Sequence, residues 1–475
     1  MSSKHKFMGS EKVGKLLFQF SLPAIIGMVV NALYNIVDRI YIGRMENVGH
    51  NAIAGVGIAF PVMVISFAFS VLIGLGSGNN ISLSIGRKER DTAERFLGNA
   101  TALGLLVSVV IGAGIYLNLG RIIPFLGASE NIGVYTREYL SVICLGCPGA
   151  ILSFTLNAAI RADGNPKKAM MTMLIGAVTN IVLDPIFIFS FGMGVRGAAV
   201  ATIISQYVSA AWTVYYFCSP LSGIKLRPQY IRIFPDLTKR ALMIGAAPFL
   251  LQLGASCVNY AFNSSMSKYG GDLGVGAIAI TQAIIMFMTM PIFGINQGLM
   301  PILGYNYGAK LYHRVREALF KGIFASVSIC TVDFILIQLF YRRIILIFNN
   351  NPELLVIASR GLRIVSLLLP IAGMQVVSSI YFQAVGKPIF SIIMSLSRQV
   401  IILVPCILIL SRYFGLRGIW FATPAADFLA TLLTSAFLYR EMKQLRQLQQ
   451  EREAAGIPVD EADDFEEGVQ LDLDA

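Results

Sequence analysis

The chain has 475 residues, of which 55% are hydrophobic and only 14% are charged. A soluble domain carries about 25% charged residues, so this composition excludes a water-soluble globular enzyme of this size. The 30 Phe residues and the long runs of Leu, Ile and Val also exclude a disordered scaffold, because such a chain avoids water. The composition therefore indicates an integral membrane protein.

The net charge of +11 has two opposing sources. After Gln450 the chain holds ten acidic residues and one basic residue, which leaves 37 basic and 17 acidic residues in 1–450. The basic residues fall in short segments between apolar runs, where the topology rule for Lys and Arg explains them better than nucleic-acid binding does. We therefore expect no nucleic acid to bind, and residues 446–475 to form an acidic cytoplasmic tail.

Twelve apolar runs are long enough for a membrane helix, which needs roughly 20 mostly apolar residues. None of them alternates polar and apolar residues with the short period of a membrane β-barrel. The fold class that we expect is therefore an all-α integral membrane protein with twelve transmembrane helices. In chain order the runs are approximately 16–38, 52–82, 97–118, 134–160, 168–190, 196–218, 241–267, 275–304, 319–341, 354–384, 389–410 and 416–439.

The connections between these runs carry unequal numbers of Lys and Arg. Connections on the side of the N-terminus hold 25, those on the opposite side hold 10, and three more arginines fall inside runs (Arg360, Arg363 and Arg398). Cytoplasmic segments carry the excess of Lys and Arg, so the bias predicts that both termini are cytoplasmic. That topology requires an even number of spans, which twelve satisfies.

The two halves of the chain resemble each other at a nearly constant offset. A duplicated six-span unit explains this, and because six is even, both copies insert in the same orientation. We expect two pseudo-symmetric six-helix lobes around a central cleft, a common arrangement for alternating access, with the N-terminal lobe in 1–220 and the C-terminal lobe in 221–445. The matches are Gly194-Val-Arg196-Gly197 with Gly415-Leu-Arg417-Gly418 (offset 221), Gly164-Asn-Pro166 with Gly386-Lys-Pro388 (222), and Pro23 with Pro248 (225).

Four aspartates lie within the spans: Asp38, Asp184, Asp333 and Asp427. A charged side chain near the bilayer centre costs about 2.5–3.5 kcal/mol on insertion scales, so each of them is a candidate functional residue. For Asp333 and Asp427 a structural role is the better interpretation, and Asp427 is expected to form a buried ion pair with Arg398 of the preceding span.

Asp38 ends the first span in the segment Asn31-Ala-Leu-Tyr34-Asn35-Ile-Val-Asp38. Helical spacing puts Asn31, Tyr34 and Asn35 on one face with the carboxylate. A face this polar is unsuited to lipid, so it should line a cavity or a partner helix. We expect these three residues to contact the substrate.

Asp184 follows Asn180 by one helical turn and precedes Pro185, which can bend the helix because it lacks an N–H group. Two carboxylates with amide and hydroxyl oxygens form a hard-oxygen set for Na⁺. They would equally form a proton site, since a desolvated carboxylate pair holds one proton more tightly. The alternative is that each aspartate only caps a helix or pairs with a neighbouring one.

Asn157 and Gln206 lie inside the fourth and sixth spans. They either face the cavity of the N-terminal lobe, where they would contact the substrate, or form simple hydrogen bonds between helices. The sequence leaves these two interpretations open.

Several segments together resemble the multidrug and toxic compound extrusion (MATE) transporters, and are closest to the MepA-like and DinF-like bacterial branch of that family. The resemblance covers about residues 10–445, and its motifs are specific in combination rather than singly. They are Phe20-Ser-Leu-Pro23-Ala-Ile-Ile-Gly27, Asn31 to Gly43, Ala54 to Pro61, Arg161-Ala-Asp-Gly-Asn-Pro166 and Asn180-Ile-Val-Leu-Asp-Pro185.

The resemblance implies export of amphipathic cationic drugs in exchange for Na⁺ or H⁺. It carries the cation or proton coupling site onto Asp38, Asn180, Asp184 and Thr202, which would bind Na⁺ if the exporter is sodium-coupled. It also places Pro23 where the first helix of the family bends. No cofactor is expected besides such a coupling ion.

The C-terminal lobe departs from part of the family. Some relatives have further acidic coupling residues in helices seven, eight and ten, where this chain offers only amides. This departure concentrates the expected coupling site in the N-terminal lobe. The amides are Asn259, Asn263, Gln282, Asn296 and Gln375.

We therefore predict a multidrug exporter in the bacterial cytoplasmic (inner) membrane, monomeric, with small cationic drugs or dyes and the lipid bilayer as its partners. The alternative function is a flippase or exporter of lipid-linked or polyprenyl precursors, which would need several basic residues in its cleft. An enzyme would need a nucleophile–base pair or paired acids on a polar loop. The three histidines (His5, His50 and His313) lie outside or at the edges of spans, so we expect no enzymatic activity.

Overall fold

The computed structural model describes residues 3–45, 49–349 and 351–454, and these residues form helices and turns with no strand. The first half contains α1 (Ser3–Ser10), α2 (Val13–Gly43), α3 (Gly49–Gly86), α4 (Arg90–Leu117), α5 (Leu119–Phe125), α6 (Glu130–Ala162), α7 (Pro166–Pro185), the π-helix η1 (Ile186–Ser190) and α8 (Gly194–Cys218). The second half contains the short 3₁₀-helix η2 (Pro228–Tyr230), α9 (Pro235–Gly308), α10 (Tyr312–Leu346), α11 (Pro352–Val365), α12 (Leu369–Ala384), α13 (Pro388–Leu396), the π-helix η3 (Ser397–Leu403) and α14 (Val404–Ala454).

These elements form twelve segments of membrane-spanning length at the predicted positions. By length and hydropathy, eight of the described helices are clear spans, or nine when α11 and α12, bent by 54°, count as one. The helix α8 adds a more polar span of 25 residues. The long helix α9 is broken into two spans at Gly271 (φ 60°), and the continuous segment Pro388–Ala454, formed by α13, η3 and α14, is broken into two spans at Gly415 (φ 55°). The helical membrane fold with twelve spans is therefore confirmed.

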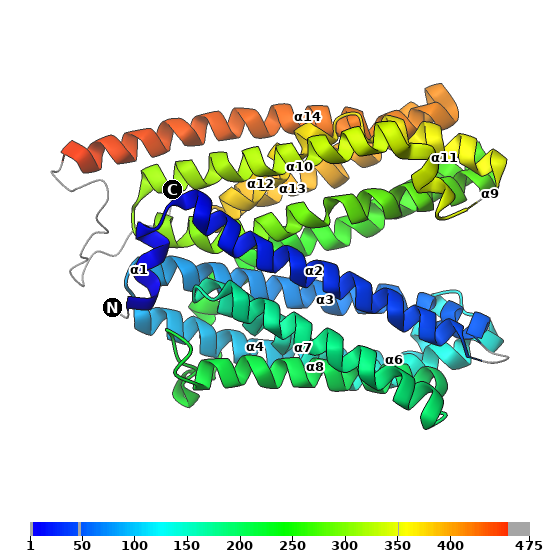
Figure 1. Cartoon of the computed structure of the whole chain (residues 1–475), viewed down its shortest axis with the longest axis horizontal. Coiled ribbons are helices and arrows are strands. Elements are labelled where there is room, and N and C mark those ends of the chain that lie inside the picture. The colour runs from blue at the N-terminus through cyan, green and yellow to red at the C-terminus, as the bar shows by residue number, and fades with distance from the viewer. Residues whose placement is uncertain (1–2, 46–48, 350, 455–475) are drawn as a thin grey trace.

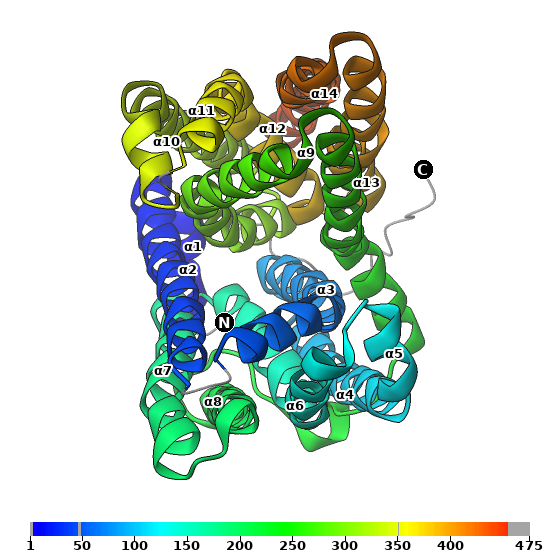
Figure 2. The ribbon, with the colours of Figure 1, turned by 90° about the vertical axis from the view of Figure 1, so that its right-hand side faces the viewer.

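The spans form two lobes, one from α2 to α8 and one from α9 to α14 (Figures 1 and 2). We call the end of the molecule at which α1 lies the α1 end. There, a single hydrophobic cluster combines residues of both lobes, such as Phe20 and Tyr305. Towards the opposite end each lobe has its own cluster, around Ile42 in the first lobe and around Trp420 in the second. Among the described residues, the large cluster that both lobes share thus lies at the α1 end.

Glycines allow the two lobes to approach closely along α3 and α9. A Cβ atom added to Gly86 would lie 2.1 Å from the carbonyl oxygen of Tyr305, and one added to Gly308 would lie 2.3 Å from that of Leu83. Both distances are far below van der Waals contact, so any larger residue would force the lobes apart. The contact between the lobes at the α1 end therefore depends on backbone packed directly against backbone.

The duplicated motifs adopt the same conformation in both lobes. Gly194 and Gly415 have φ values of 56° and 55°, and Gly164 and Gly386 have φ values of 83° and 79°. These left-handed conformations are unfavourable for residues with a Cβ, which explains why glycine stands at both positions of each pair. The offsets of 221 and 222 residues thus reflect equivalent turns, and the pseudo-symmetry of the two lobes is confirmed.

The second glycine of the repeated Gly-X-Arg-Gly motif, Gly197 in the first lobe and Gly418 in the second, allows a test of how closely the backbone packs there. A Cβ on Gly418 would lie 1.9 Å from the carbonyl oxygen of Leu410, and one on Gly197 would lie 2.6 Å from that of Phe187. We expect Gly418→Ala and Gly197→Ala to lower the thermal unfolding temperature of the purified protein, with a cost of about 1–3 kcal/mol each, as is typical of overpacking. The effect of Gly418→Ala should be the larger one.

Gly114→Ala is the matched control, because a Cβ there meets no atom within 4 Å. Alanine favours helix more than glycine does, so this variant should unfold at the same or a slightly higher temperature. Equal unfolding temperatures for all three variants would contradict the close approach at the repeated motif.

Candidate functional site

The helices α2 and α7 bring two carboxylates together in the first lobe. Asp38 lies just over one turn before the end of α2, and Asp184 lies directly before Pro185, where α7 continues into the π-helix η1. Asp184 is fully buried and Asp38 is 8% exposed. The two carboxylates lie close enough to interact electrostatically. Like charges at such a site disfavour each other unless a proton or cation separates them.

Asn180 links Asp184 to the neighbouring helix α8. Its Nδ2 atom donates to Oδ1 of Asp184 over 3.2 Å and lies 3.5 Å from Oγ1 of Thr202. Asn180 and Asp184 are one turn apart on α7, so both side chains lie on the same helix face. Three of the four predicted coupling residues thus form one hydrogen-bonded group, and Asp38 interacts electrostatically with its carboxylate.

Three oxygens of this group are buried and have no hydrogen-bond partner: Oδ1 of Asp38, Oδ2 of Asp184 and Oδ1 of Asn180. Buried polar atoms are almost always paired in proteins, and an isolated buried charge is costly. A bound proton would satisfy a carboxylate oxygen, and Na⁺ would accept several oxygens as ligands. The residues present therefore fit either ion.

Two tyrosines lie near the carboxylate pair. Tyr34, one turn before Asp38 on α2, lies within electrostatic range of Asp38 and Asp184. Tyr139 of α6 is almost fully buried and lies within range of the same two aspartates and of Tyr34. Tyr139 is missed from the sequence, because one tyrosine in an apolar span resembles a packing residue. Its hydroxyl group, a polar atom in an apolar span, is the one sequence feature that could have marked Tyr139 as a site residue.

The predicted substrate residues of α2 lie along the same helix as Asp38. Asn35 is exposed, and its Nδ2 atom donates to the backbone oxygen of Asn31 over 2.7 Å and to Oδ1 of Asn31 over 3.1 Å. Both asparagines precede Asp38 by one to two turns. Their polar groups therefore lie on the helix that carries Asp38, and the side chain of Asn35 is exposed there.

Asn157 and Gln206 occupy different surroundings. Asn157 donates to the backbone oxygen of Ala169 over 2.7 Å and accepts a hydrogen bond from Arg161, so it links α6 to α7. Gln206 of α8 faces α6 at Gly146, and its Oε1 atom is buried without a partner. Of these two residues, only Gln206 has an unused polar atom in this conformation.

Two prolines lie in the helices that carry the site. Pro23 is buried inside α2, about four turns before Asp38. Pro185 ends α7, and the next five residues form a π-helix, a conformation that is rare and frequent at functional sites. Because proline lacks an N–H group, each position loses one helical hydrogen bond and can bend.

The second lobe contains a separate charged group. Nε of Arg398, in the π-helix η3, donates to Oδ1 of Asp427 over 2.7 Å, which is the ion pair that we expected. Asp333 of α10 is buried, and its Oδ2 atom has no partner. The second lobe thus neutralises one of its two buried aspartates internally.

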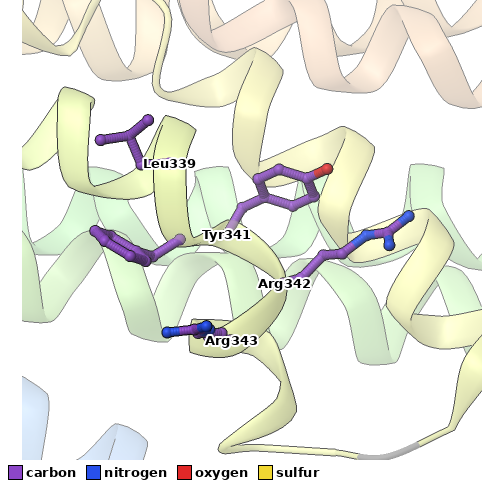
Figure 3. A pocket seen from close by; sticks show the side chains of 5 residues that line it. Leu339, Tyr341, Arg342 and Arg343 are labelled. Atoms are coloured by element: carbon purple, nitrogen blue, oxygen red, sulfur yellow. The ribbon is translucent and has the colours of Figure 1, made fainter.

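Two surface cavities lie in the second lobe, away from the predicted site residues. One of about 290 Å³ is formed by the end of α10, and Figure 3 shows its side chains around Tyr341, Arg342 and Arg343. The other, of about 510 Å³, is lined by residues 256–264 of α9 and by Val404 and Leu408 of α14. Neither cavity contains a residue of the carboxylate group in the first lobe.

Comparison with known proteins places this chain in a family. The family model described as MatE matches residues 23–186 and 249–408. The multidrug export protein MepA of Staphylococcus haemolyticus is 24% identical over 433 residues, which cover 91% of this chain and 95% of that protein. MepA of Staphylococcus aureus (strain MSSA476) is 27% identical over 433 residues, which cover 90% and 94%.

A solved structure gives the same result for the fold. It is a multidrug resistance MATE family transporter of the MOP superfamily in its outward-facing conformation, with a TM-score of 0.87 and 25% identity, covering 94% of this chain and 99% of that chain. The match of the family model extends over both lobes and more than half of the sequence. The resemblance found in the sequence is therefore confirmed, and the chain belongs to the MatE family of multidrug and toxic compound extrusion (MATE) transporters.

Proposed function

We propose that the protein exports amphipathic cationic compounds in exchange for H⁺ or Na⁺ by alternating access of its two lobes. The observation that carries this proposal is the buried group of Asp38, Asn180 and Asp184, whose three unpartnered oxygens require a proton or cation. The MepA relatives are multidrug export proteins, and they support this substrate class. The family is one of transporters, so we assign no catalytic step.

Coupling would arise because the ion and the drug act on the same helix. A proton or Na⁺ bound at Asp38 and Asp184 removes negative charge from the end of α2, which also carries Asn31, Tyr34 and Asn35. A cationic drug near these side chains loses that attraction when the ion binds. Export follows if the two ligands compete, or if they bind differently to the two conformations of the lobes.

Bending of α2 at Pro23 and of α7 at Pro185 would let the first lobe respond to the ion. Both prolines remove a helical hydrogen bond, so the helix segments that carry Asp38 and Asp184 can reorient at low cost. For Na⁺ the ligands would be oxygens of Asp38, Asn180, Asp184 and Thr202. For a proton the carboxylate pair alone would suffice.

We propose that the α1 end faces the cytoplasm of a bacterium and that the protein lies in the inner membrane as a monomer. The 25 to 10 distribution of Lys and Arg favours this orientation. The two lobes share a hydrophobic core at the α1 end and have separate cores at the other end. This arrangement, together with the likeness to an outward-facing transporter, supports a state that is closed towards the cytoplasm.

The flippase alternative receives no specific support. It would need free basic residues in the cleft to bind pyrophosphate. Arg398 pairs with Asp427 over 2.7 Å, and Arg363 donates to Gln338 and stacks over the ring of Tyr341 at 5.1 Å. Two of the three intramembrane arginines are thus engaged within the second lobe.

Substitution of the two carboxylates tests the coupling site. We expect Asp38→Asn and Asp184→Asn each to reduce ethidium efflux by about tenfold or more, because each removes an acid on which drug and ion binding depend. Efflux would be measured in cells stripped of their own pumps, at matched expression. Asp272→Asn is the matched control, since Asp272 is exposed between the two spans of α9 and should leave efflux unchanged. Normal efflux by both site variants would exclude this coupling site.

Substitution of Thr202 separates the two ions. Thr202→Val removes a hydroxyl oxygen that can bind Na⁺ but accepts no proton at neutral pH. In vesicles with the Na⁺ and proton gradients imposed separately, we expect efflux to follow one gradient. A sodium-coupled exporter with Thr202→Val should need several-fold more Na⁺, whereas a proton-coupled one should keep its efflux. Thr213→Val is the control, because Thr213 lies further along α8 and donates only to Ala210 of its own helix.

A further inference from the structure

The short helix α1 is attached to the first lobe through a buried histidine. Nε2 of His5 lies 2.9 Å from Oδ1 of Asp163, the residue that follows α6, and the two residues are 6% and 1% exposed. Phe7 of α1 stacks on Phe20 of α2 with ring centroids 6.3 Å apart. It also lies against Gly164, where a Cβ would be 3.3 Å from its ring.

Asp163 is a rigid anchor for this contact. Its Oδ2 atom accepts hydrogen bonds from the hydroxyl of Tyr216 over 2.6 Å and from the backbone N–H of Gly223 over 2.8 Å. The backbone N–H of Ile224 donates to Oδ1 over 3.2 Å. The carboxylate is therefore fixed by the end of α8 and the loop after it, and His5 adds α1 to a site that the first lobe has already formed.

The other end of α1 is attached to the second lobe. The last carbonyl groups of a helix have no partner within the helix. Here the backbone oxygen of Met8 accepts from Nδ2 of Asn306 over 3.1 Å, and that of Glu11, the residue directly after α1, accepts from Arg314 over 2.5 Å. Nε of Arg314 also donates to Oδ1 of Asn306 over 3.0 Å, so the two side chains act as one clamp on the end of α9 and the start of α10.

We propose that α1 is a strap between the two lobes, which stabilises the state closed at the α1 end and must release one of its two anchors before that end opens. The proposal rests on the alternating access proposed above. Eight residues are too few for a helix that is stable by itself, so the contacts of α1 with the lobes hold it in place. Any separation of Asp163 from Arg314 therefore breaks the contact at one end.

Distance measurements between the lobes test the strap. Spin labels at Lys167 of α7 and Lys443 of α14, both exposed, would report the separation at the α1 end by double electron–electron resonance in lipid nanodiscs, with the six native cysteines replaced. We expect His5→Ala to raise the ratio of open to closed molecules about fivefold or more, as loss of one buried hydrogen bond to a charged group predicts. His5→Gln can still donate a hydrogen bond to Asp163, so its ratio of open to closed molecules should stay near that of the wild type.

The two anchors differ, because α1 continues into α2 of the first lobe and so keeps that covalent connection when His5 is lost. Arg314→Ala weakens the contact of α1 with the second lobe and should shift the ratio in the same direction as His5→Ala. The double variant should shift it no further than the larger single effect, because His5 cannot hold the lobes together once α1 is free of the second lobe. Lys6→Ala, an exposed position on α1, is the matched control and should have no effect. Unchanged distances in His5→Ala, or shifts that add fully in the double variant, would overturn the strap.

The measurement needs neither drug nor ion gradient. A failure of ethidium efflux would therefore count against the proposed function and leave the strap standing, while unchanged distances would count against the strap alone. If Arg314→Ala proves unstable in size-exclusion chromatography, the three variants at His5 and Lys6 still test whether α1 holds the lobes together.

Discussion

The free energy that is lost when a polar atom lies away from water without a hydrogen bond constrains every part of this structure. Every backbone N–H and C=O group in lipid must be bonded within the protein, so the spans are helices, and their breaks occur at glycines such as Gly271 and Gly415. The same cost makes each intramembrane carboxylate conspicuous. Asp427 is offset by Arg398, whereas Asp38 and Asp184 retain oxygens with no protein partner. Asp333 of the second lobe also has an unpartnered oxygen, but the pair in the first lobe combines two acids with Asn180, and this grouping supports the coupling role proposed for it.

The two lobes have equivalent backbone turns and π-helices, but they carry different charged side chains. The turns at Gly194 and Gly415 have the same left-handed conformation, and each lobe contains a π-helix, η1 or η3. In the first lobe the π-helix follows an acid that lacks a cation partner. In the second it contains an arginine that already has an acidic partner. The two lobes therefore share one backbone scaffold, and they differ in whether the acid near the π-helix is paired with an arginine.

Contacts between the lobes gather at the α1 end. Glycines of α3 and α9 pack backbone against backbone there, the hydrophobic core is shared, and α1 connects Asp163 to Arg314. Glycine contacts are tight but depend on shape alone, while the hydrogen bonds of α1 depend on two specific anchors. The stability of the closed state thus has a general part from packing and a specific part from the strap.

Hydropathy along the chain was sufficient for the number and positions of the spans, because the requirement for about 20 apolar residues is local. The repeat was visible for a similar reason, since glycines with positive φ cannot be replaced freely. Asp38 and Asp184 stood out from the cost of burying charge. None of these inferences needs knowledge of which helices are neighbours.

The remaining features of the site depend on contacts between neighbouring helices, which only the tertiary structure shows. The contact of Asn180 with Thr202, the place of Tyr139 beside the carboxylates and the use of Asn157 as a link to α7 all join residues of different helices. Helix packing sets these contacts, and an apolar sequence gives each helix many faces on which it could pack. The link from His5 to Asp163 joins residues 158 positions apart, and only the folded lobes bring that pair together.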